Sequence, residues 1–134
     1  PSIARQSVII KCNQQTSVLL GNYEFYYAAG LFSKIFAVEV PEDSKPAELL
    51  EVILDNAYEA VSNSMKYAKC SRIKISVHVL NQMIRCSISD NGIGCKEVID
   101  GMGIAGMRKR MRDINGILDF ETEAGFTINM LLPL

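Results

Sequence analysis

The stretch from Ser44 to Ala68 constrains the fold most, because its residues repeat at the spacing of a long amphipathic helix. Ser44 can cap this helix, Pro46 suits its first turn, and Glu48 lies where the helix dipole favours a negative charge. One face of the predicted helix is formed by Leu50, Ile53, Leu54, Ala57, Ala60, Val61, Ser64 and Ala68. A helix with such a face packs it against the rest of a globular fold.

The opposite face of this helix is polar and carries Asn56, Glu59, Asn63 and Lys66. One interpretation is a solvated face with no further role. The other starts from Glu59 and Asn63, which lie one helical turn apart and can point at one site. Carboxylate and amide oxygens suit Mg²⁺, which takes the rest of its ligands from waters and substrate phosphates. The helix alone favours the first interpretation.

Two segments of alternating hydrophobicity follow and predict a pair of strands joined by a tight turn at 81–82. In the segment 72–80, the apolar positions are Ile73, Ile75, Val77 and Val79. In the segment 83–90, the residues of one parity are Ile84, Cys86, Ile88 and Asp90. The single histidine, His78, lies on the polar side of the first strand, and we assign it no catalytic role.

Asp90 ends the second strand on the side that should face the core. A carboxylate there is costly unless hydrogen-bond donors meet it, and the amino group of a bound base would be such a donor. The alternative is a strand end followed by a glycine-rich hairpin, in which Asp90 caps the turn. The glycines between Asp90 and Met107 suit a loop that cradles phosphate: Gly92, Gly94, Gly101, Gly103 and Gly106.

A basic helix is predicted from Gly103 to about Asn115, closed by Gly116. Its N-terminus presents unpaired N–H groups and the positive end of the helix dipole, where phosphates bind well. A final strand pair, 117–121 and 126–132, is predicted around a tight turn.

The first 37 residues carry the weakest pattern. Residues 5–20 allow a helix, and the segment 23–36 is rich in aromatic residues, which is typical of a core or of an interface with a partner segment. A short strand is predicted at 38–40, before a proline. We therefore divide the chain into an N-terminal segment, residues 1–37, and a domain over residues 38–134.

Length, charge and cysteine content exclude several classes of protein. The 134 residues suffice for a core, and the net charge of -1 argues against a nucleic-acid or membrane-surface binder. No apolar run approaches the roughly 18 residues of a membrane-spanning helix. The four cysteines are widely spaced, so neither a zinc site nor a disulfide framework is predicted, and we expect reduced thiols in a cytoplasmic protein. Because the first residue is Pro1, we expect a processed or excised piece.

Three patterns now occur in a fixed order: a helix with Glu59, Asn63 and Lys66, the strand end Asp90-Asn91-Gly92-Ile93-Gly94, and Gly101-x-Gly-x-x-Gly106-Met107. This order resembles the ATP-binding catalytic domain of bacterial sensor histidine kinases, in the GHKL ATPase superfamily. In the most similar subgroup, the asparagine box reads Glu-Ala-x-x-Asn-x-x-Lys-His-Ala, which corresponds to residues 59–68. The resemblance covers about residue 47 to the C-terminus. It implies a Bergerat-type ATP-binding fold, an α/β two-layer sandwich with a mixed sheet and helices on one face.

The resemblance also implies roles for the helix residues and two cofactors, ATP and Mg²⁺. Asn63 would ligate the Mg²⁺ that bridges the ATP phosphates. Glu59 would position a water or assist proton transfer, and Lys66 would approach phosphate oxygens.

For the loop residues, the resemblance implies contacts with the base and the phosphates. Asp90 would bind the adenine amino group, with Gly92 and Gly94 leaving room for the base. Residues 95–102 would form a short lid over ATP. The second glycine box would place a helix N-terminus at the phosphates, and it would consist of Gly101, Gly103, Gly106 and Met107.

The expected function is transfer of the ATP γ-phosphoryl group to a histidine on a dimerisation domain, and from there to a response regulator. Tyr67 replaces the histidine of the subgroup's box, at a position where the resemblance implies contact with the nucleotide. The family's phosphoacceptor histidine is missing, and the chain alone should show little or no autophosphorylation. Residues 5–20 would then be the tail of a dimerisation helix. The alternatives are a serine kinase of the anti-sigma-factor type and a nucleotide-binding regulatory module that signals through residues 23–36.

Overall fold

The computed structural model describes residues 4–11, 18–67, 69–80, 82–93 and 103–134. Its elements are β1 (Ala4–Lys11), α1 (Val18–Glu39), the 3₁₀ turn η1 (Glu42–Ser44), α2 (Pro46–Tyr67), β2 (Arg72–Leu80), β3 (Met83–Asp90), α3 (Ile104–Asp113), β4 (Ile117–Glu121) and β5 (Thr127–Pro133). The long helix, the basic helix and both strand pairs predicted from the sequence are confirmed, with small shifts at their ends.

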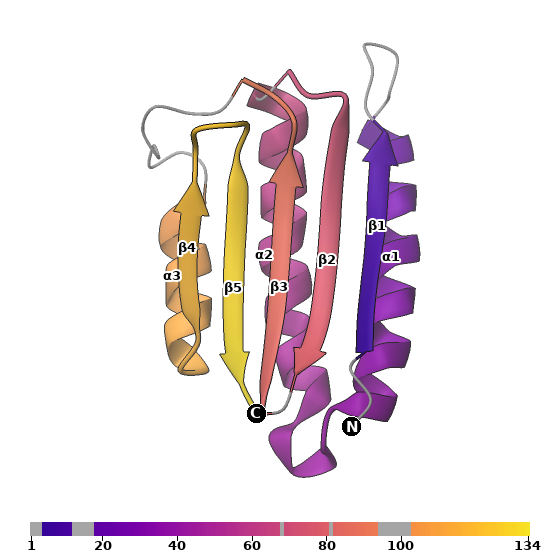
Figure 1. Cartoon of the computed structure of the whole chain (residues 1–134), viewed down its shortest axis with the longest axis vertical. Helices are drawn as coiled ribbons and strands as arrows, with labels where there is room; N and C mark the ends of the chain where they lie inside the picture. The colour runs from indigo at the N-terminus through magenta and orange to yellow at the C-terminus, as the bar shows by residue number, and fades with distance from the viewer. Residues whose placement is uncertain (1–3, 12–17, 68, 81, 94–102) are drawn as a thin grey trace.

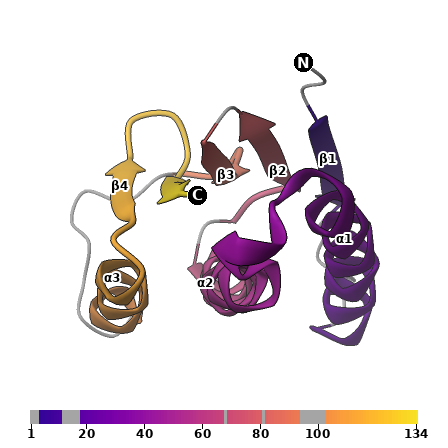
Figure 2. The same cartoon turned by 90° about the horizontal axis from the view of Figure 1, so that it is seen from below.

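The five strands form one sheet in the order β1-β2-β3-β5-β4. All four pairings are antiparallel, so the sheet is antiparallel and not mixed as predicted. Hairpins join β2 to β3 and β4 to β5, and a hairpin makes its strands antiparallel. The three α-helices lie on one face of the sheet, with α2 between α1 and α3 (Figure 1, Figure 2). The predicted two-layer sandwich is thereby confirmed.

The alternating residues of the strands form the sheet side of the core. Ile75 of β2 pairs with Ile88 of β3, which pairs in turn with Ile128 of β5. All three residues are buried, because the two-residue period of a strand places them on the face that the helices cover. From the predicted apolar face of α2, Ile53 and Ala57 are fully buried in the same core.

The N-terminal region differs from the prediction in its secondary structure. Residues 4–11 form β1, which pairs with β2, and are neither the start of a helix over 5–20 nor the tail of a dimerisation helix. The β-branched residues Val8, Ile9 and Ile10 favour a strand, and Ile10 is fully buried in the core.

Helix α1 also changes the interpretation of the aromatic segment 23–36. Its Phe25, Phe32 and Phe36 are buried in the core, whereas Tyr26 and Tyr27 are exposed. Since α1 continues to Glu39, the strand predicted at 38–40 is wrong, and the predicted division after residue 37 falls inside a helix.

The start of α2 differs from the prediction in its cap. Ser44 ends η1, and the Lys45 carbonyl accepts hydrogen bonds from the N–H groups of Glu48 and Leu49 at 3.1 and 3.2 Å. Lys45 therefore takes the place predicted for Ser44. Pro46 occupies the first helical position, as its fixed φ and missing N–H favour.

Cys86 on β3 gives a prediction for thiol chemistry. Its side chain is fully buried, and burial raises the pKa of the Cys86 thiol to about 12. At pH 8 the thiolate is therefore scarce, and we expect alkylation in the native protein to be on the order of a thousandfold slower than in the unfolded chain. Iodoacetamide labelling followed by peptide mass spectrometry measures both rates. Rapid labelling of Cys86 in the native protein would contradict the burial.

Candidate functional site

The Asp90 carboxylate at the end of β3 is buried and held by three donors. Its Oδ2 accepts a hydrogen bond from Ser64 Oγ of α2 at 2.7 Å. Its Oδ1 accepts from the N–H groups of Gly92 at 2.9 Å and Phe126 at 3.2 Å. Asp90 is 6% exposed, so the predicted orientation toward the core is confirmed. The Gly92 contact shows that the carboxylate also caps the following turn, as the second interpretation of Asp90 predicts. The contact with a bound base stays a prediction.

These contacts leave Asp90 with capacity for one further donor. A carboxylate offers about four acceptor positions, and groups of the described residues fill three of them. Because the three donors come from α2, the turn after β3 and the start of the β5 segment, the carboxylate has a fixed orientation. Such a group is suited to recognise one N–H of a ligand in a defined position.

Gly125 lies against the backbone of Asp90 and has φ +85°. A Cβ at this position would collide with the Asp90 carbonyl oxygen. The neighbouring residue, Phe126, exchanges backbone and side-chain hydrogen bonds with Asp90. The sequence pattern located this turn but did not connect it with Asp90, which is more than 30 residues away along the chain.

Asn91 fixes the chain directly after Asp90. Its Oδ1 accepts hydrogen bonds from the N–H groups of Ser71 and Arg72, both at 2.9 Å, and its Nδ2 donates to Ser71 Oγ at 2.8 Å. These bonds tie the end of β3 to the start of β2, so they hold the turn that contains Gly92.

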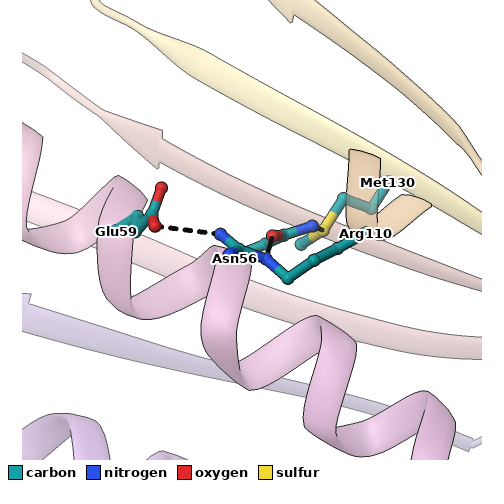
Figure 3. Close-up of polar contacts among 4 residues, drawn as sticks. All are labelled: Asn56, Glu59, Arg110 and Met130. Atoms are coloured by element: carbon teal, nitrogen blue, oxygen red, sulfur yellow. Dashed lines mark hydrogen bonds and ion pairs between the residues drawn. The ribbon is translucent and has the colours of Figure 1, made fainter. Parts of the chain in front are cut away.

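A second polar cluster joins α2 to α3 (Figure 3). Arg110 Nε donates to Asn56 Oδ1 at 2.7 Å, and Arg110 Nη2 forms an ion pair with Glu59 Oε1 at 2.9 Å. Asn56 Nδ2 donates to the Met130 sulfur at 3.5 Å. Asn56 is fully buried, so the solvated face predicted for this side of α2 is wrong at its position, because α3 and β5 cover it. The sequence showed Arg110 only as one of several basic residues on the helix.

The glycines of the second box differ in their surroundings. Gly103 directly precedes α3 with φ +73°, and a Cβ there would collide with Glu59 Oε2. Gly106 is half-buried, and a Cβ there would make ordinary contact with Arg110 at 3.5 Å. Met107 is fully buried in the core, so its side chain packs against the protein.

Helix α2 connects the two clusters, since Ser64 contacts Asp90 and Glu59 contacts Arg110 and lies against Gly103. Asn63 lies between them along the helix and is half-buried. The structure thus brings Asp90 and Gly103 against the part of α2 that carries Glu59 and Asn63. Gly94, Gly101 and the lid at 95–102 lie outside the described residues. Lys66 belongs to α2, but its side chain lies outside the described part.

Comparison with known proteins identifies the family. Residues 47–134 match the profile of the family described as histidine kinase-, DNA gyrase B-, and HSP90-like ATPase. The chain belongs to this family. The matched region contains α2, Asp90 and α3, and an ATPase domain of this family implies use of ATP. A second profile, described as a domain of unknown function (DUF3837), matches residues 1–75 and so includes β1 and α1.

Relatives of this ATPase domain include sensor histidine kinases. The sensor histidine kinase MctS of Rhizobium johnstonii is 30% identical over 118 residues, which cover 83% of this chain and 25% of MctS. The oxygen sensor histidine kinase NreB of Staphylococcus carnosus is 27% identical over 93 residues, covering 65% of this chain and 27% of NreB. The chain thus spans about a quarter of these relatives.

Solved structures of histidine kinases share the fold. The blue-light activated histidine kinase of Erythrobacter litoralis EL346 superposes with a TM-score of 0.58 at 17% identity, over 84% of this chain and 41% of that one. A structure of its histidine kinase domain gives a TM-score of 0.53 at 15% identity, over 92% of this chain and 65% of that one.

Two kinds of feature are absent from the described residues. Within them, no helix combines the length and the apolar character needed to cross a membrane. The same part of the chain contains no group of three His, Cys, Asp or Glu side chains that could hold a metal ion.

Proposed function

We propose that the chain is the ATP-binding catalytic domain of a sensor histidine kinase. It binds Mg²⁺-ATP and donates the γ-phosphoryl group to a histidine on a dimerisation and phosphotransfer domain of the same kinase, from which a response regulator receives it. The observation that carries this proposal is the buried Asp90 carboxylate, which three protein donors orient and which keeps one acceptor position that no described residue fills. We place the domain in the cytoplasm.

The adenine end of the proposed site is built on Asp90. Its remaining acceptor position takes one N–H of the adenine amino group, and a carboxylate already fixed by Ser64 and Phe126 loses little freedom on binding. We assign Gly92 and Gly94 the role of leaving room for the base, as the resemblance to histidine kinases implies.

The phosphate end is built on α2 and the start of α3. Glu59 Oε2 is buried and has no hydrogen-bond partner among the described residues, which suits a group that meets a water or ligand. Asn63 contributes an amide oxygen one turn further along α2, and Mg²⁺ accepts such a ligand together with phosphates and waters. Mg²⁺-ATP, when bound, supplies the phosphoryl group and charge neutralisation. We also assign Lys66, Gly101, Gly103 and Gly106 to the phosphate end. The side chain of Met107 is buried in the core, so Met107 supports the start of α3 and does not contact phosphate.

Calorimetric titration with a non-hydrolysable ATP analogue, with and without Mg²⁺, tests this proposal. We expect Asp90→Asn to weaken binding about 10- to 100-fold, because it alters an oriented acceptor that three donors and the ligand share. Asn63→Ala should weaken binding and remove its dependence on Mg²⁺.

The matched control is Asp119→Asn, which makes the same chemical change at an exposed position of β4 and should leave affinity unchanged. The proposal fails if the wild type binds no adenine nucleotide, or if Asp90→Asn and Asp119→Asn bind equally well.

A further inference from the structure

The Arg110 side chain makes contacts that adenine recognition does not require. It reaches from α3 to two residues of α2: Nε donates a hydrogen bond to Asn56 Oδ1 at 2.7 Å, and Nη2 lies 2.9 Å from Glu59 Oε1 in an ion pair without hydrogen-bond geometry. Asn56 and Glu59 lie three residues apart and therefore on one side of α2. Figure 3 shows the guanidinium between them. One planar group thus holds two neighbouring side chains at once.

The partner at the inner end of this cluster is packed against the sheet. Asn56 is fully buried, and its Nδ2 contacts the sulfur of Met130, a fully buried residue of β5. With Nδ2 directed at the sheet, Oδ1 faces α3 and accepts from Arg110. The position of the guanidinium is therefore set from the sheet through Asn56. Its Nη2 then meets Oε1 of Glu59, whose side chain is 35% exposed.

The two carboxylate oxygens of Glu59 have different surroundings. Oε1 is held by Arg110, and Oε2 is buried against Gly103 at the start of α3, without a hydrogen-bond partner among the described residues. A long carboxylate side chain without the Arg110 contact would sample several rotamers. With it, one oxygen is fixed and the other is directed toward the N-terminus of α3.

We propose that Arg110 is a positioning residue for the phosphoryl transfer, which holds Glu59 so that Oε2 faces the phosphate end of the site. This inference rests on the proposed function. An arginine is required because its planar group can donate from Nε to Asn56 and place its charge beside Glu59 at the same time, whereas a lysine has one nitrogen and cannot meet both residues in this geometry. Positioning of this kind acts on the transition state more than on ground-state binding of ATP.

The kinetic test compares Arg110→Lys with Arg112→Lys, the same substitution at an exposed position of α3. ADP formation by the protein together with its phosphoacceptor domain gives kcat and KM for ATP. We expect Arg110→Lys to lower kcat about 10- to 100-fold with KM changed less than about threefold, and Arg112→Lys to match the wild type. In a Glu59→Gln background, Arg110→Lys should add less than about a twofold further loss, because it acts through Glu59.

A spectroscopic test does not depend on activity. The Nε–H proton of Arg110 should exchange with solvent more slowly than those of the exposed Arg108 and Arg112 in ¹⁵N NMR spectra, and Asn56→Leu should abolish that protection. An Arg110 Nε–H that exchanges as fast as the exposed ones overturns the inference, as does an Arg110→Lys variant with wild-type kcat or a loss that is fully additive with Glu59→Gln. A wild type that binds no nucleotide while Arg110 Nε–H is protected overturns the proposed function and leaves the cluster a structural one.

Discussion

Replacing Gly125 by alanine is expected to destabilise the fold by about 2–4 kcal/mol and to abolish nucleotide binding. Gly125 has φ +85°, a conformation that costs an alanine energy in itself. The new Cβ would also collide with the Asp90 carbonyl oxygen, which is a backbone atom and cannot rotate away. Relief of this collision displaces Asp90 from Phe126, whose N–H donates to Asp90 Oδ1 and whose carbonyl accepts from the Asp90 N–H at 3.0 Å.

The matched control is Gly30→Ala on α1, where a Cβ would meet nothing within 4 Å. Alanine is the better helix former, so this variant should be more stable than the wild type by up to about 1 kcal/mol. Guanidinium unfolding curves for both variants, with titration of the ATP analogue, measure the two effects. A Gly125→Ala protein with unchanged stability and affinity would show that the turn does not support Asp90.

Local patterns predicted most elements of the fold because those elements follow the period of their own residues. The apolar positions of α2, β2 and β3 recur at spacings of 3.6 and 2, and their burial agrees with those periods. The prediction of a helix over residues 5–20 is wrong for β1, because the strand forms by pairing with β2, more than 60 residues away in the sequence. Asn56 was assigned to a solvated face because the sequence does not show that α3 covers that side of the helix.

Local patterns likewise predicted some residues of the candidate site and missed the contacts that connect distant segments. The parity of β3 located Asp90, and helical spacing put Glu59 and Asn63 on one side of α2. The donors that make Asp90 a fixed acceptor come from Ser64 and Phe126, at separations of 26 and 36 residues, which local periodicity cannot connect. A hydroxyl at position 64 on an otherwise apolar face was the one available signal, since a buried hydroxyl needs a polar partner. Arg110 gave no such signal, because a basic residue on a helix usually faces solvent.

Phe32 of α1 provides a test of whether residues 1–37 are a separate segment or part of the ATPase domain. Its ring is 1% exposed and belongs to the core that α2 and the sheet share. Nearby on α1, the Phe25 ring meets the ring of Tyr58 on α2 edge to face, with centroids 5.5 Å apart. The packing of α1 therefore supports the helix that carries Glu59 and Asn63.

We expect Phe32→Ala to lower the free energy of unfolding by about 3–5 kcal/mol, because it removes a buried ring and leaves a cavity. Tyr27→Ala is the matched control: Tyr27 is 63% exposed on the same helix, and its truncation should change stability by less than about 0.5 kcal/mol. If α1 and the sheet form one cooperative unit, circular dichroism and Tyr fluorescence will report a single transition that Phe32→Ala shifts equally for both probes. Two separate transitions, with only the first shifted, would instead support a division of the chain near residue 37.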